Sequence, residues 1–135
     1  EQVLLCRRAI EPRRDYWTLP AGFMENGETT EEGAARETWE EARAQVRDLA
    51  LYRVYDVPYI NQVYLFYRCT LVDGSHAPGP ESTDTRLFHR DEVPWDELAF
   101  PSIYRALRAF FEDRAASRDY PLAVETIYRR RDAGG

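Results

Sequence analysis

The chain has 135 residues, of which 44% are hydrophobic and 13% aromatic, and this is enough apolar material for the core of one domain. Its formal net charge is −6, so a general nucleic-acid-binding surface, which needs a basic stripe, is not expected. All 18 basic residues are arginine, which excludes Schiff-base chemistry and any P-loop lysine.

The two cysteines and the hydropathy of the chain bear on its compartment. Cys6 and Cys69 lie far apart and form no CxxC pattern, so the sequence predicts neither a zinc site nor a disulfide framework. No apolar run approaches the ~20 residues needed to span a membrane. A reducing cytoplasm, with no membrane partner, is the simplest expectation.

The chain begins with a short apolar strand, predicted over residues 2–6, and a loop rich in arginine follows it. Arg7 and Arg8 in this segment are candidates to hold substrate phosphates, although a solvated loop explains them equally well. Tyr16 and Trp17 then bring aromatic rings to the edge of residues 18–44, where most of the unusual chemistry lies.

Residues 29–44 are predicted to form a helix that carries a cluster of acids, because a Thr-x-x-Glu capping box opens a stretch of good helix formers. Glu37, Glu40 and Glu41 stand at i, i+3 and i+4, so their carboxylates converge on one face. A solvated acidic face is one interpretation. Since three such groups repel one another, a cation between them is the other, and oxygen ligands suit Mg²⁺ or Mn²⁺.

The rest of the chain alternates between strands, a long loop and a second helix. The polar loop over residues 73–85 is too long for a simple turn, and it carries Glu81 and Asp84. The order of elements predicts an α/β fold of α/β/α layers, in which the two helices pack on a mixed sheet. We expect strands over residues 46–57, 63–72 and 86–89, a helix over 102–112, a strand-like stretch over 122–128 and a disordered tail from about 129.

The acids of residues 18–44 are spaced like those of the Nudix box, and this stretch therefore resembles the Nudix hydrolases. Thr38 and Ala44 stand where the box has aliphatic residues, and Arg43 replaces its second glycine, which usually supplies a left-handed helix cap. The positions that match are Gly22, Glu28, Arg36, Glu37, Glu40 and Glu41.

Most of residues 3–112 resembles one Nudix subgroup, the plant FAD pyrophosphatases and the bacterial Nudix hydrolases that carry an N-terminal zinc ribbon. The resemblance implies that residues 1–135 form a single Nudix domain, with a mixed β-sheet sandwiched between helices, and that a preceding strand and a zinc ribbon are missing from this chain. The stretches that carry it are VLLCRRAIEPRRDYWTLPAGFMENGET, GAARETWEEA, INQVYLF and PGPESTDTRLFHRDEVPWDELAFPSIY.

The resemblance also implies roles for individual residues. Glu28 and Arg36 would form the pair that orients the helix acids. The general base would be Glu37 or, from the long loop, Glu81 or Asp84. The metal ligands would be Glu37, Glu40 and Glu41, joined by the backbone carbonyl of Ala21 or Gly22.

The activity that follows from the resemblance is Mg²⁺- or Mn²⁺-dependent hydrolysis of a nucleoside diphosphate linked to another moiety, with FAD first and ADP-ribose or NADH next. AMP and a monophosphate would be released. A triphosphate-sanitising pyrophosphohydrolase and a non-catalytic nucleotide sensor are the alternatives, and the oligomeric state, including a homodimer, stays open. The residues expected to stack on a planar ring are Tyr16, Trp17, Tyr55 and Tyr59.

Overall fold

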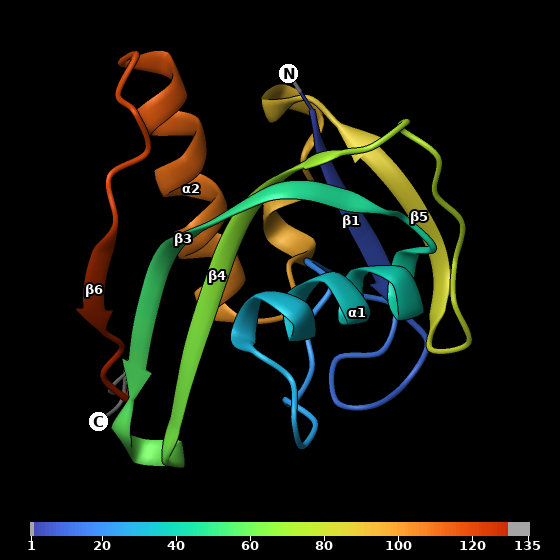
Figure 1. The fold of residues 1–135 in the computed structure, drawn as a ribbon, viewed down its shortest axis with the longest axis horizontal. Coiled ribbons are helices and arrows are strands. Elements are labelled where there is room, and N and C mark those ends of the chain that lie inside the picture. The colour runs from blue at the N-terminus through green and yellow to red at the C-terminus, as the bar shows by residue number, and fades with distance from the viewer. Residues whose placement is uncertain (1, 130–135) are drawn as a thin grey trace.

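Two helices and six strands make up the part of the chain that the computed structural model describes, residues 2–129 (Figure 1). The long helices and strands lie close to their expected positions, while β5 begins at Ser82 and so shortens the long loop. The elements are β1 (Val3–Arg8), β2 (Trp17–Thr18), α1 (Thr30–Ala42), β3 (Val46–Val57), β4 (Gln62–Leu71), β5 (Ser82–Phe88), α2 (Pro101–Ala115) and β6 (Ala123–Thr126), with short 3₁₀ turns η1 (Pro58–Ile60), η2 (Arg90–Glu92) and η3 (Trp95–Glu97).

The strands form two three-stranded sheets. The first has the order β2-β1-β5 and is antiparallel throughout. The second has the order β4-β3-β6 and is mixed, because β3 pairs antiparallel with β4 and parallel with β6. The predicted α/β class is confirmed, with the strands divided between two sheets.

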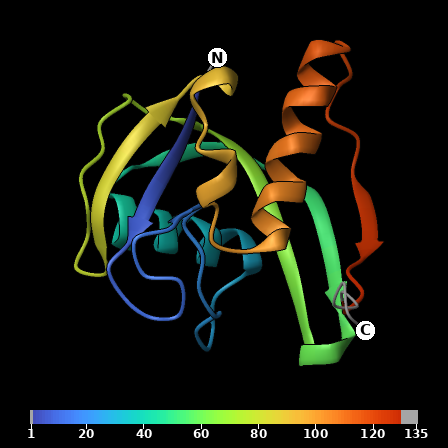
Figure 2. The same ribbon diagram turned by 180° about the vertical axis from the view of Figure 1, so that it is seen from behind.

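The first sheet lies between the two helices, and the alternation of side chains along β1 makes this clear. Cys6 faces α1, where its Sγ lies 3.9 Å from Oε1 of Glu41. Leu5 points to the opposite face, where it is fully buried in a cluster that includes Ile103 and Leu107 of α2. Figures 1 and 2 show the same arrangement, with α1 on one side and α2 and the 3₁₀ turns η2 and η3 on the other.

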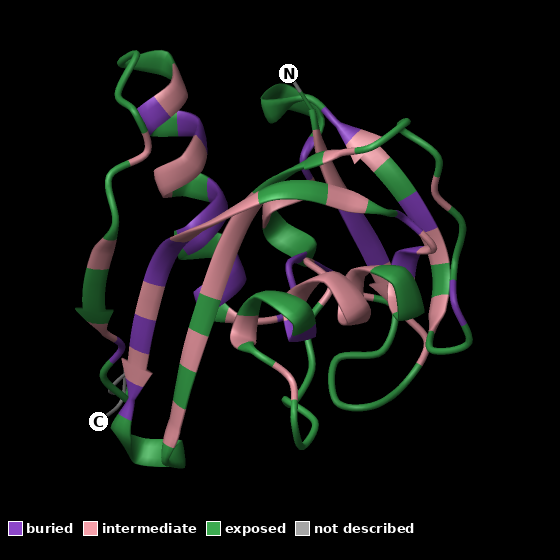
Figure 3. Cartoon of the chain, viewed as in Figure 1, coloured by how far each residue is buried: buried purple, intermediate pink, exposed green. Residues whose placement is uncertain are grey.

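A second, smaller core lies where β3 crosses α2. It is built from Tyr55 and Val57 of β3, Ala106 of α2 and Ile127 after β6. Figure 3 shows that buried residues gather on β1, on β3 and along one side of α2. The apolar face predicted for the second helix is therefore its packing face.

The ends of α1 explain how its acids are held in register. The capping box is confirmed, since Thr29 Oγ1 accepts from the amide of Glu32 at 3.0 Å and the Glu32 carboxylate accepts from the amide of Thr29 at 2.8 Å. At the other end Arg43 is left-handed, with φ 46° and ψ 41°, and its amide donates to the Trp39 carbonyl. Arginine thus takes the conformation that glycine adopts more cheaply, at a cost of roughly 1 kcal/mol.

Neither helix within residues 2–129 is long and apolar enough to cross a membrane. The tail predicted to be disordered from about residue 129 lies, apart from that residue, outside the described part of the chain.

Candidate active site

The turn that precedes α1 is packed directly against the helix acids. The amide of Ala21 donates to Oε2 of Glu41 at 3.2 Å. Gly22 lies so close to Glu37 that a Cβ there would sit 2.3 Å from the carboxyl carbon. A side chain at this position would displace the Glu37 carboxylate from its place against the turn.

Arg36 is the centre of the ion pairs on this face. Its guanidinium donates two hydrogen bonds to Glu28, at 2.8 and 3.0 Å, and one each to Glu37 and Glu40, at 2.7 and 2.9 Å. A further bond, at 3.1 Å, reaches the carbonyl of Phe23. One arginine therefore fixes the loop after Gly22 and two of the helix acids in a single arrangement.

These contacts shift the pKa values of Glu28 and Arg36. The hydrogen bonds from Arg36, and then the amide of Glu25, lower the pKa of Glu28 to about 2. The pKa of Arg36 rises, chiefly because of its hydrogen bonds with Glu28 and Glu37. Glu28 therefore stays ionised and can act as the permanent anchor of Arg36, as the resemblance implies.

Glu41 behaves in the opposite way because it is largely buried and lies beside other acids. The pKa of Glu41 is raised to about 8. The largest cause is burial, and the smaller ones are its hydrogen bond with Glu37 and the charges of Glu37 and Glu81. Beneath it, burial and the charge of Glu41 raise the pKa of the Cys6 thiol to about 12. Glu37, Glu41 and Glu81 thus form an acidic group whose mutual repulsion a cation would relieve.

The fit of this group to a metal ion depends on Arg36. Within residues 2–129, no three acidic, histidine or cysteine side chains stand already arranged to hold a metal. The Arg36 guanidinium bridges Glu37 and Glu40, so a metal would have to compete with Arg36 for both. The donors near Gly22 are all oxygens, and Glu41 bears an unneutralised charge when ionised. The chemistry of the donor set therefore fits a hard divalent cation.

The two acids of the long loop differ in their relation to the acids of α1. In the β1–β5 register Thr85 lies opposite Cys6, on the α1 face, and Asp84 lies opposite Arg7, on the other face. Asp84 accepts from Arg86 at 3.1 Å and from the amide of Thr85 at 2.8 Å. The structure therefore brings Glu81, whose charge acts on Glu41, to the acid group, and leaves Asp84 outside it.

Two of the expected ring-stacking residues belong to the core instead. Tyr55 is fully buried against Phe66, and Trp17 is buried edge-on against Phe88. Neither offers a free face to a planar ligand in this structure, which corrects the expectation for both. Sequence alternation cannot tell which face of a strand points inward, and this is why both were misplaced.

The other substrate-binding candidates remain at the surface or partly exposed. The Tyr16 ring lies under the guanidinium of Arg13 at 4.0 Å, and Tyr59 lies in η1, at the far end of the β3–β4 hairpin. The guanidinium of Arg7 donates to the Asp15 carbonyl at 2.9 Å and that of Arg8 to the Pro12 carbonyl at 2.7 Å. Both arginines thus brace the loop that follows β1.

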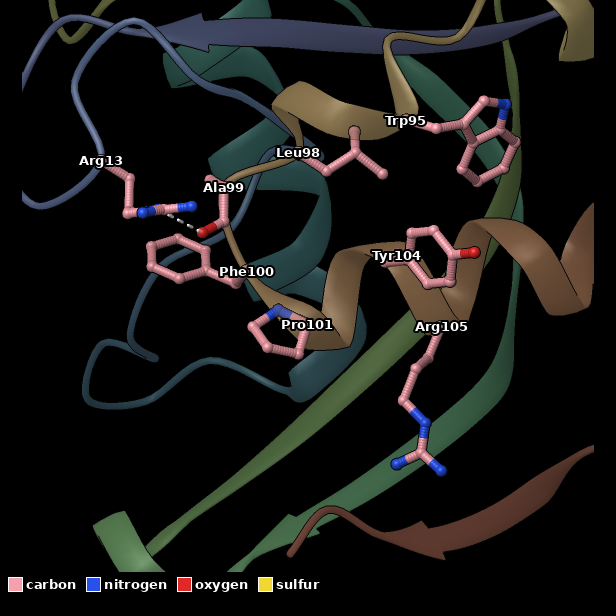
Figure 4. A pocket seen from close by; sticks show the side chains of 8 residues that line it. All are labelled: Arg13, Trp95, Leu98, Ala99, Phe100, Pro101, Tyr104 and Arg105. Carbon is pink, nitrogen blue, oxygen red and sulfur yellow. Dashed lines mark hydrogen bonds between the residues drawn. The ribbon is translucent and has the colours of Figure 1, made fainter. Parts of the chain in front are cut away.

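A pocket of about 330 Å³ opens where the loop after β1 meets the start of α2 (Figure 4). The Arg13 guanidinium donates to the Ala99 carbonyl at 3.0 Å on one side, and Arg105 reaches out from α2 on the other. The sequence gives no sign of this pocket, because it predicts only a helix over residues 102–112 in this region. The lining residues are Arg13, Trp95, Leu98, Ala99, Phe100, Pro101, Tyr104 and Arg105.

Comparisons with known proteins agree with this geometry. The family model described as NUDIX domain matches residues 1–110. A Nudix hydrolase from Nitrosomonas europaea, of known crystal structure, is 47% identical, covers 95% of this chain and 72% of its own, and superposes with a TM-score of 0.91.

Two curated relatives are similar over shorter parts of their length. The NAD-capped RNA hydrolase NudC of Edwardsiella ictaluri is 29% identical over 117 residues, which are 86% of this chain and 44% of the relative. An ADP-ribose pyrophosphatase of Methanocaldococcus jannaschii is 28% identical over 103 residues, which are 73% of this chain and 60% of the relative. The chain therefore spans only about half the length of these relatives.

Proposed function

The chain belongs to the Nudix family, which confirms the resemblance of its acidic box, and on this premise we propose that it hydrolyses the pyrophosphate bond of a nucleoside diphosphate linked to another moiety. The substrates proposed are FAD, ADP-ribose and NADH, cleaved to AMP and a second monophosphate. The observation that carries the proposal is the convergence of Glu37 and Glu41 on the turn at Gly22, with Arg36 holding the surrounding acids in place.

The acid group provides the means to bind an anionic substrate. A pyrophosphate and a cluster of carboxylates repel each other, so they can meet only through divalent cations. Glu37, Glu40 and Glu41, with the carbonyl of Ala21 or Gly22, are the proposed ligands of Mg²⁺ or Mn²⁺. When bound, such ions neutralise the charge on the leaving phosphate and lower the pKa of a bound water.

The protein's own side chains supply orientation and proton transfer. Glu28 holds Arg36 through two hydrogen bonds, and Arg36 in turn fixes the direction of Glu37 and Glu40. Glu81 is exposed and lies in the same acidic group, so we assign it as the base that takes a proton from the attacking water. Glu37 is the alternative base, and it would have to leave its bond with Arg36.

The pocket at the start of α2 is suited to the end of the substrate that carries a ring. Arginines there can hold a second phosphate, and the Tyr104 and Trp95 rings offer aromatic contacts. Leu98 and Phe100 of its lining pack with Leu5 on the α2 side of the first sheet, whereas Cys6 contacts Glu41 on the α1 side. A substrate that reaches both places would therefore have to pass around the edge of that sheet.

A product-resolved assay tests the proposal. FAD, ADP-ribose, NADH and nucleoside triphosphates are each incubated with the protein and Mg²⁺ or Mn²⁺, and the products are separated. We expect AMP, no release with EDTA, and loss of turnover in Glu41→Gln but not in Glu31→Gln, which changes an exposed acid of the same helix.

Other outcomes of this assay would support different functions. Inorganic pyrophosphate as the main product, with a higher kcat/KM for triphosphates, would indicate the sanitising activity. Binding without any product would indicate a nucleotide sensor. Either result would overturn the proposed substrate class.

A further inference from the structure

The C-terminal carbonyls of α1 are satisfied by a distant part of the chain. The last four carbonyls of a helix have no partner within the helix. Here the carbonyl of Glu41 accepts from the amide of Gly79 at 3.1 Å, and the carbonyl of Ala42 accepts from the amide of Ala77 at 2.9 Å. The helix end that carries the candidate metal ligands is therefore capped by the long loop.

Gly79 makes this contact possible because its backbone lies directly on the helix. A Cβ at this position would fall 1.7 Å from the Glu40 carbonyl oxygen and 2.8 Å from its carbonyl carbon. Both are backbone atoms of α1, so no side-chain rotation can make room. Any other residue must separate the loop from the helix.

The same segment is anchored at its other end. The carbonyl of Glu81 accepts from the amide of Ala9 at 2.9 Å, just after β1, and the amide of Ser82 donates to the Gly79 carbonyl at 3.1 Å. The backbone on both sides of Glu81 is thus tied down, on one side to α1 and on the other to the first sheet. Its side chain is exposed, and its charge acts on Glu41.

We propose that residues 77–81 form a strap that sets the position of Glu81 relative to the acids of α1, with Gly79 as the positioning residue. The inference rests on the proposed function, and it adds that the loop is a fixed part of the site rather than a lid. Gly79 has no side chain and packs on the backbone of Glu40 and Glu41, so it acts through Glu81. If the strap lifts, α1 keeps its ligands, because Arg36 and the turn at Gly22 still hold them.

The substitution Gly79→Ala tests the proposal, and Gly74→Ala is its matched control. Gly74 lies in the same loop with φ 76°, and a Cβ there meets no atom within 4 Å, so the control strains the backbone without touching α1. Because general-base catalysis contributes typically ~10²–10⁴-fold, we expect Gly79→Ala to lower kcat at least ~10-fold with little change in KM. Gly74→Ala should change kcat less than ~3-fold.

A double-mutant comparison identifies the strap's target. Glu81→Gln should lower kcat strongly in the wild-type background and by less than ~3-fold in Gly79→Ala, because Glu81 is already displaced there. Additive losses, or a Gly79→Ala enzyme as active as the Gly74→Ala control, would overturn the proposal. Ala77→Pro, which removes the donor to the Ala42 carbonyl, serves as a second variant should Gly79→Ala fail to fold.

A measurement that needs no substrate separates this inference from the proposed function. Hydrogen exchange of the amides at residues 77 and 79 should be slow in the wild-type protein, and fast in Gly79→Ala while the amides of α1 stay protected. If the wild-type protein cleaves no substrate but shows this exchange pattern, the proposed function is wrong and the strap is supported. If the amides at 77 and 79 exchange equally in both proteins, the strap fails whatever the activity.

Discussion

Replacement of Glu41 by glutamine is expected to stabilise the metal-free protein at neutral pH. Glu41 is partly buried beside Glu37 and Glu81, and its pKa is raised from 4.5 to about 8. An acid whose pKa is raised by folding favours the folded state when protonated. The loss of folding stability that Glu41 causes is absent below pH 4.5, and it grows as the pH rises towards 8.

The magnitude follows from this shift. Proton linkage changes the free energy of unfolding by about 1.4 kcal/mol per pH unit. Between pH 4.5 and pH 7, ionisation of Glu41 therefore lowers the stability of the folded protein by at most about 3 kcal/mol. Because Glu41 keeps some contact with water, we discount this to about 1–2 kcal/mol. A glutamine oxygen can still accept from the amide of Ala21, and its amide can donate to Glu37, so the neutral side chain keeps both contacts.

Urea unfolding in EDTA measures this difference at several pH values. At pH 7 the Glu41→Gln protein should unfold at higher urea, and the gain should vanish near pH 4.5. Added Mg²⁺ should stabilise the wild-type protein more than the variant, because a ligand stabilises only what binds it. A variant that is less stable at pH 7, or a gain that is the same at both pH values, would refute the reasoning.

Three further changes test other parts of the structure. Arg43→Gly should stabilise the protein by about 1 kcal/mol, since glycine adopts the left-handed conformation of this cap without strain. Thermal or urea unfolding measures this, and an unchanged midpoint would show that Arg43 is not strained. Arg36→Lys keeps the charge but cannot bond both oxygens of Glu28, so we expect kcat at saturating metal to fall ~10–100-fold relative to wild type. An equal kcat would show that Arg36 does not orient the helix acids. Arg105→Ala, at the pocket near α2, should raise KM several-fold with kcat nearly unchanged, and a loss in kcat alone would argue against a binding role there.

The sequence by itself determined the local features of this protein. The capping box and the extent of α1 follow from local sequence, and so does the contact of Glu37 with Glu41 one helical turn apart. These features depend only on residues close together in the chain. The left-handed Arg43 could be anticipated for the same reason, because the box marks where the helix ends. The long strands β3 and β4 and the helix α2 were also readable, since strong β-formers and a periodic apolar face need no tertiary information. The short strand β2 and the start of β5 at Ser82 were not.

Only the tertiary structure decided which of these residues meet. Period-two alternation shows that neighbouring side chains in a strand point apart, but not which face is covered, so Trp17 and Tyr55 proved to be core residues. The β1–β5 register separated Asp84 from Glu81, and the contact of Gly79 with the end of α1 joins residues almost forty positions apart. Such contacts depend on how sheets and helices pack over long sequence separations, and no local pattern in the chain encodes that packing.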